Sequence, residues 1–284
     1  MDSRAFRRFR RNKGALAGLV LVVAVTVLGI LGPWLAPFDP VDQFTDALLL
    51  DSGLPAGPRA VAGHWLGGDP LARDELSRLL SGARVSMLVA YIATAIAVLI
   101  GVGLGLISGY VGGRVDSISM RFVDVVLSMP FLLLAIVMQR VWDAPGIWTI
   151  CIVLGVLSWT TLARVTRAKT MEARELDYVQ AARALGLRHS RILARHVLPN
   201  VAGPIVAIAT ILVARMIIAE SALSFLGLGV RPPTASWGSM LNDSQSLLLG
   251  VPRLTLYPAV LISMAVFGFN LFGEGLRDAF DPKD

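Results

Sequence analysis

Six long apolar runs constrain this chain more than any other feature. They cover residues 14–38, 86–110, 122–141, 147–162, 201–226 and 254–272. A helix needs about 20 mostly apolar residues to cross a hydrocarbon core of about 30 Å. Because lipid offers no hydrogen-bond partner to the backbone, each run is expected to be helical. The sequence therefore predicts an all-α integral membrane protein with six transmembrane helices.

Composition agrees with a membrane bundle. Charged residues make up 16% of the chain and hydrophobic residues 55%, whereas about a quarter of a soluble domain is charged. The isoelectric point near 10.1 does not indicate a nucleic-acid partner, because no basic patch is interleaved with stacking aromatics. In a membrane chain surrounded by lipid, an excess of arginine is typical of cytoplasmic segments.

The distribution of basic residues predicts the topology. Residues 1–13 carry six of them and precede an apolar run too long for a cleaved signal peptide, so a cytoplasmic basic N-terminus and a retained first helix (14–38) are expected. Six crossings then give an extracytoplasmic loop at 39–85, a five-helix core at 86–272 and a cytoplasmic tail at 273–284. Cytoplasmic segments hold 18 basic residues against 6 outside, which supports this orientation.

The loop 39–85 is acidic and rich in glycine and proline, so an irregular structure is expected. Its end, residues 70–80, favours a helix on the membrane surface, with Asp69 as N-cap and Pro70 in the first turn. A plain hydrophilic connector and a docking surface are both open interpretations of this loop.

Charged residues at membrane depth are costly unless they face protein or water. Asp124, Arg215 and Glu220 are therefore candidate pathway or bundle polar residues. Asp124 lies three residues after Arg121, which can neutralise it, and Arg140 is expected to reach the outer interface. For Glu220, a hydrogen-bonding role within the bundle is favoured over substrate contact.

Three glycines, Gly101, Gly105 and Gly109, recur every fourth residue in the second apolar run. They form a smooth helix face where another backbone can approach closely. The spacing is not that of a nucleotide-binding fingerprint, and no strand precedes it.

No constellation for catalysis or metal binding is apparent. Cys151 is the single cysteine, and none of the three histidines shows the spacing of a zinc site. No lysine stands in a phosphate-binding loop. We expect no metal site, no catalytic residue and no cofactor on this chain, so energy for transport would come from an ion gradient or another polypeptide.

A polar, basic segment, 177–200, interrupts the apolar chain. Helical periodicity places Tyr178, Ala181, Ala182 and Leu185 on one face, and Gly186 suits a left-handed cap. A second short helix with an arginine face follows, and Pro199 suits the first turn of the fifth apolar run. The segment is predicted to be a helical elbow for a groove on another protein, or an amphipathic helix resting on anionic lipid.

The elbow resembles the EAA loop of ABC importer permeases. The similarity, within residues 170–199, is carried by Gln180, Ala181, Ala182, Gly186, Ile192, Leu198 and Pro199. The stretches 68–87, 222–241 and 273–282 resemble the corresponding segments of dipeptide and oligopeptide permeases of the C-subunit type.

This resemblance implies a type I ABC importer permease fold in a bacterial inner membrane, with the elbow as a cytoplasmic coupling helix. Tyr178 and Leu185 would join the matched positions in contacting the ATPase. The implied partners are a second homologous permease, two cytoplasmic ATPase subunits and an extracytoplasmic peptide-binding protein, with ATP and Mg on the ATPases. The chain itself would be a transport subunit and not an enzyme. The alternative is an ion-gradient-coupled secondary transporter that uses Asp124 and Glu220 as proton sites.

Two positions depart from the family pattern. Gln180 stands where the family has a glutamate, which puts an ion pair with the ATPase in doubt. Ala72 stands where a glycine is usual, which favours a regular helix at that point.

Overall fold

The computed structural model describes residues 3–142 and 146–280. Within these ranges the regular structure is helical, apart from isolated β-bridges. The helices are α1 (Ser3–Arg11), α2 (Lys13–Leu35), α3 (Thr45–Leu48), α4 (Glu75–Val111), α5 (Gly113–Ser128), α6 (Phe131–Val141), α7 (Ile147–Arg174), α8 (Asp177–Ala184), α9 (His189–Ile192), a π-helical turn (Leu193–Val197), α10 (Leu198–Phe225), α11 (Trp237–Asp243), a 3-10 turn (Gln245–Leu247) and α12 (Arg253–Phe280).

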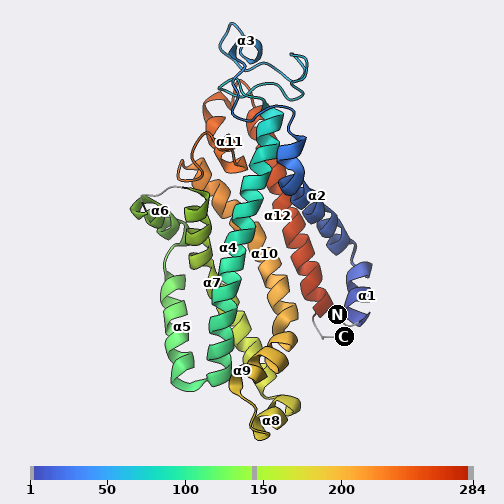
Figure 1. Cartoon of the computed structure of the whole chain (residues 1–284), viewed down its shortest axis with the longest axis vertical. Coiled ribbons are helices and arrows are strands. Elements are labelled where there is room, and N and C mark those ends of the chain that lie inside the picture. Colours follow the sequence, from blue (N-terminus) through green and yellow to red (C-terminus); the bar gives the residue numbers. More distant parts are fainter. Residues whose placement is uncertain (1–2, 143–145, 281–284) are drawn as a thin grey trace.

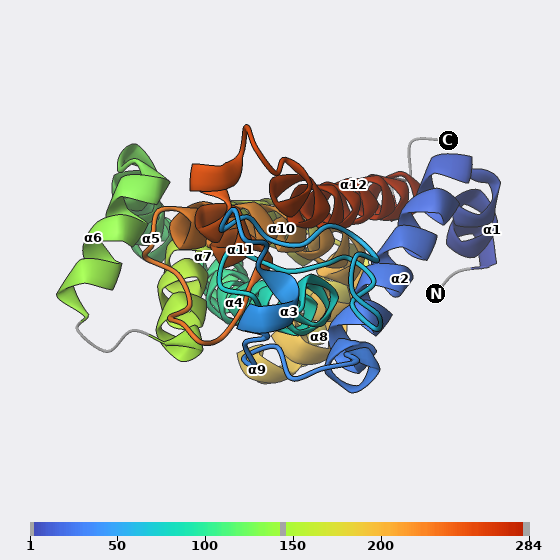
Figure 2. The same ribbon diagram turned by 90° about the horizontal axis from the view of Figure 1, so that it is seen from above.

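The long helices form one elongated bundle (Figure 1). Seen from above, α4, α7 and α10 lie in the middle, with α2 and α12 on one side and α5 and α6 on the other (Figure 2). α3 and α11 lie at one end of the bundle, hereafter the α3 end, and α8 and α9 lie at the opposite α8 end. The first helix, α1, packs on α12, where the rings of Phe9 and Phe272 meet edge to face at 5.8 Å.

In the part of the chain that the structure describes, five helices are long and apolar enough to cross a membrane: α2, α4, α7, α12 and the continuous helix His189–Phe225. The sixth predicted span, 122–141, is broken and not one continuous helix: it falls on α5 and α6, which together are also long and apolar enough to cross a membrane. α5 and α6 meet at an angle of 87°, with Met129 and Pro130 at the break. Pro130 has no N–H to donate and disfavours a helical conformation at Met129, so the helix ends before them.

The helix predicted over 70–80 begins later than expected. α4 starts at Glu75, and Asp74 is its N-cap, with the carboxylate accepting the Ser77 N–H at 2.8 Å. Asp69 instead closes the preceding turn, where its Oδ1 accepts the N–H groups of Leu71 and Arg73. The assignment of Asp69 as cap was therefore wrong, because a second aspartate five residues later occupies that position.

The structure also contradicts the regular helix expected at Ala72. Its φ of +59° lies in the left-handed region, so the residue forms a turn and not a regular helix. The methyl group is fully buried with Leu48 and Ala56 in a small apolar cluster under the loop. The glycine that the family carries at this position is explained by the same backbone conformation.

Buried ion pairs fasten this loop to the bundle. Arg78 in α4 pairs with Asp69 of the loop at 3.2 Å, and Arg73 of the loop pairs with Asp243 in α11 at 3.4 Å. Trp237, also in α11, is fully buried and donates its indole N–H to the Leu79 carbonyl at 3.2 Å. The loop is thus an ordered cap on the α3 end and not a loose connector.

The C-terminal tail is helical for most of its length. α12 continues through Gly273 to Phe280 without a break. The predicted boundary between membrane core and tail, at residue 273, thus falls within a continuous helix, and residues 281–284 lie outside the described ranges.

Candidate functional site

The polar segment forms the predicted elbow at the α8 end (Figure 1). α7 ends at Arg174, and α8 begins three residues later at Asp177. At the other end of α8, Gly186 has a φ of +75°. Its N–H donates to the Arg183 carbonyl, and the Leu187 N–H donates to that of Ala182. This is a Schellman cap, and it confirms the left-handed conformation expected at the glycine.

The faces of α8 differ from the prediction in one respect. Tyr178 and Leu185 are 47% and 81% exposed, and Ala181 is exposed beside them. Ala182, placed on the same face from the sequence, is buried at 6% together with Val179. Ala182 therefore packs into this chain, and the face free to contact another protein is formed by the other three residues.

Gln180 has a specific local role. Its side-chain amide donates to the Arg174 carbonyl at the end of α7 at 3.0 Å and approaches the Glu175 carboxylate at 3.4 Å. A carboxylate has no hydrogen to donate to a carbonyl. The departure from the family glutamate thus replaces a charge with a hydrogen bond that fastens α8 to the end of α7.

The second half of the elbow continues directly into the membrane helix. α9, the π-helical turn and α10 form one helix, and Pro199 lies in the first turn of α10, as predicted. Pro199 has no N–H for the Arg195 carbonyl four residues earlier, where the helix widens into the π turn. Ile192 is fully buried, whereas Leu198 is exposed.

The elbow also contacts the end of α4. The Tyr110 hydroxyl lies 3.1 Å from Nδ1 of His189, and the Arg183 guanidinium stacks on the Tyr110 ring at 5.2 Å. Arg174 donates to the carbonyl of Gly109 at 3.2 Å. Three central helices, α4, α7 and α10, therefore meet at this one joint.

The glycine face of α4 packs against α7, as its spacing predicts. A Cβ added to Gly101, Gly105 or Gly109 would lie 2.6 Å from a carbonyl oxygen of α7. On the facing side, Gly155 of α7 is as close to α4, with 2.7 Å to Ile96 Cβ. The two backbones are in direct contact along most of their shared length.

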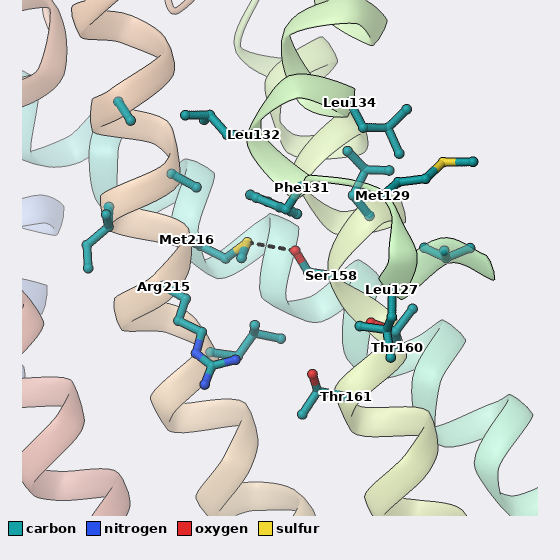
Figure 3. Close-up of a pocket in the computed structure, with 16 residues that line it drawn as sticks. Leu127, Met129, Phe131, Leu132, Leu134, Ser158, Thr160, Thr161, Arg215 and Met216 are labelled. Atoms are coloured by element: carbon teal, nitrogen blue, oxygen red, sulfur yellow. Dashed lines mark hydrogen bonds between the residues drawn. The ribbon is translucent and has the colours of Figure 1, made fainter. Parts of the chain in front are cut away.

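A cavity of about 580 Å³ opens between α10, α7 and the broken pair α5 and α6 (Figure 3). Its walls are mainly leucine, methionine and phenylalanine side chains. Arg215 extends from α10 into this space, on the side where Thr161 of α7 lies. Ser158, deeper in the wall, donates its hydroxyl to the sulfur of Met216 at 3.5 Å.

The other charged candidates lie elsewhere. Asp124 of α5 pairs with Arg164 of α7 and not with Arg121. Glu220 is fully buried and accepts hydroxyl hydrogen bonds from Ser86 at 3.1 Å and from Ser224 at 2.7 Å. The structure therefore does not gather Asp124, Arg215 and Glu220 into one site. Arg140 lines a separate small cavity with Arg231.

Three residues that make contacts in or near the site were not identified from the sequence: Val179, Tyr110 and Arg164. Val179 carried a usable signal, since an apolar residue three before Ala182 marks the same helix face. The contacts of Tyr110 and Arg164 join segments 40 to 79 residues apart, so no local pattern indicates them.

Metal ligands do not cluster anywhere in residues 3–142 and 146–280. Cys151 is a free thiol in the core. The features that remain are a membrane-spanning bundle, an exposed helical elbow on rigid supports and a cavity at membrane depth. These define a membrane permease that works with other subunits.

The comparisons with known proteins identify the family. Residues 101–283 match the family described as binding-protein-dependent transport system inner membrane component, and the chain belongs to it. Residues 3–51 match the N-terminal transmembrane domain of oligopeptide transport permease C. The chain is thus a multi-pass inner membrane protein, a permease subunit of an ABC importer and not itself an enzyme. ATP is used by partner ATPases in this family, and the ion-gradient alternative is not supported.

Individual relatives are similar over nearly their whole length. The dipeptide transport system permease protein DppC of Bacillus subtilis is 41% identical over 98% of this chain and 85% of its own length. The oligopeptide transport system permease protein OppC of Escherichia coli is 39% identical over 99% and 90%. The inward-facing MetNI methionine ABC transporter shares the fold, with a TM-score of 0.59 over 71% of this chain and 95% of the other, at 18% identity.

Proposed function

We propose that this chain forms one half of the translocation path of an ATP-driven importer of di- or oligopeptides, with a second homologous permease as the other half. The α8 end would be cytoplasmic, together with both termini, and the α3 end would face an extracytoplasmic peptide-binding protein. The peptide substrate is supported by the names of the relatives with 37–41% identity over nearly the full chain.

The observation that carries the mechanism is the rigid connection behind the exposed face of α8. Tyr178, Ala181 and Leu185 are free to enter a cleft on one of two ATPase subunits. Behind them, the buried Val179 and Ala182 hold α8 to the chain. α7 then carries any displacement to α4 through the glycine contacts. Closure of an ATPase pair on ATP would thus move the central helices as a unit.

In this proposal, Gln180, Gly186, Ile192, Leu198 and Pro199 shape the elbow and do not contact the ATPase directly. Gly186 sets the turn, Gln180 fastens α8 to α7, and Ile192 is buried beneath. Leu198 and Pro199 begin the membrane helix α10.

The test is Ala181→Trp, which adds bulk to the exposed face without filling the core. The matched control is Ala168→Trp, at an exposed alanine of α7 outside the elbow. In the complex purified from membranes, we expect the Ala181 variant to lose the ATPase subunits and ATP-dependent peptide uptake, while the control keeps both. Full uptake by both variants would refute the coupling role of α8. ATP-dependent uptake without any ion gradient separately tests the energy source.

A further inference from the structure

Arg215 is a cation at membrane depth without a partner among the described residues. It lies ten residues before the end of α10 at Phe225, about 15 Å along the helix at 1.5 Å per residue. Its side chain is exposed, and it makes no hydrogen bond or ion pair with any residue in the described ranges. Because an unpaired guanidinium in hydrocarbon is costly, Arg215 must face water or an anion.

The cavity around Arg215 has the dimensions of a small-molecule site. Its volume of about 580 Å³ lies within the range of known ligand pockets, roughly 300–1,000 Å³. Arg215 is the one charged residue among its lining side chains, and the remaining walls are apolar apart from Ser158, Thr160 and Thr161. Such walls tolerate side chains of many shapes, since dispersion and burial are not directional.

Along α5 and α7, the charges nearest the cavity neutralise each other. Asp124 lies three residues before Leu127 in the cavity wall, and Arg164 lies three residues after Thr161. These two side chains, each more than half exposed, form an ion pair across α5 and α7. In α10 the nearest charge is Glu220, which is fully buried and bonded to Ser86 and Ser224. The charge of the cavity is therefore the single positive charge of Arg215, which matches a ligand with one carboxylate.

We infer that Arg215 binds the C-terminal carboxylate of the peptide as it passes through the permease. This inference rests on the proposed function and names a contact within it. Every unmodified peptide ends in a carboxylate, whatever its side chains, and the planar guanidinium binds that group with two parallel hydrogen bonds. A segment of the second permease is the other candidate occupant, and its contact with Arg215 would not distinguish a peptide from its amide.

The experiment uses the complete transporter with its binding protein in liposomes. Uptake of trialanine is compared with uptake of trialanine amide, which lacks the carboxylate. The variants are Arg215→Gln and Arg215→Lys, and the matched control is Arg84→Gln, which removes an exposed arginine from the α2–α4 groove on another face of the bundle. The uptake rate of each variant is divided by that of the wild type for the same peptide, so that the preferences of the binding protein cancel.

We expect Arg215→Gln to lower trialanine uptake about tenfold, the scale of a lost charged hydrogen bond, and to leave amide uptake nearly unchanged. Arg215→Lys should recover part of the trialanine uptake, and Arg84→Gln should lower neither. Equal loss for both peptides, with or without loss of the second permease from the complex, would overturn the carboxylate contact and assign Arg215 to assembly or packing. No change for either peptide would overturn it as well. If the wild type takes up neither peptide with ATP, the proposed function itself fails.

Discussion

Gly105→Ala tests the close contact between α4 and α7. The new Cβ would lie 2.6 Å from the Ala163 carbonyl oxygen and 2.6 Å from Thr166 Cβ, whereas ordinary contact begins near 3.4 Å. The helices must therefore separate by about 0.8 Å at this level. Overpacking of this kind costs about 1–3 kcal/mol. The matched control is Gly103→Ala in the same helix, where no atom lies within 4 Å of the added Cβ.

Both substitutions gain the same helix propensity, up to about 1 kcal/mol, so their difference isolates the packing term. We expect Gly105→Ala to be less stable than Gly103→Ala by about 1–3 kcal/mol. Cys151 supplies the assay, because it is the chain's single cysteine and fully buried. The complex is heated with a thiol-reactive dye, and the subunits are then separated by electrophoresis. The amount of dye on this chain reports how far its core has become exposed. Coincident labelling curves for the two variants would refute the contact.

Three further outcomes are expected. Ala72→Gly should be nearly neutral, because relief of about 1 kcal/mol at a positive φ offsets about 0.8 kcal/mol for the lost methyl group; Ala90→Gly, at a buried position within α4, should cost about 2 kcal/mol in the same thermal assay. Gln180→Glu should increase hydrogen exchange across α8, because the amide donor to α7 is lost beside Glu175; unchanged exchange would contradict the fastening role. Glu220→Gln should retain ATP-dependent uptake within a few-fold, since the amide still bonds the serines, and complete loss would favour a proton site.

Length and apolarity were enough to find the membrane helices, because the hydrocarbon thickness sets a physical threshold. The break at Met129 and Pro130 was missed, although the proline signalled it. The length of the apolar run predicts one span, whereas the missing N–H of the proline predicts the break. The glycine face and the cap at Gly186 were predictable, because each depends on backbone geometry that few other residues allow.

The functional faces were harder to predict. Periodicity groups residues by angle but does not say which side of a short helix the rest of the chain covers, and so Ala182 was placed with Tyr178 on the free face. The cavity around Arg215 is built from α5, α6, α7 and α10. Its walls come from segments far apart in the sequence, so only the packed structure reveals which side chains share it.

The joint at the α8 end has a mechanical consequence. The end of α4 contacts both neighbouring helices here. The Tyr110 hydroxyl of α4 lies within hydrogen-bonding distance of His189, at the start of the helix leading into α10, and its ring stacks with Arg183 of α8. Arg174 of α7 donates to the Gly109 carbonyl of α4. A displacement of the elbow would therefore be passed to α4, α7 and α10 at one point. Among the described residues, α2 and α12 contribute no side chain to these contacts, so a displacement of the elbow would reach those two helices only through their packing on α4 and α10.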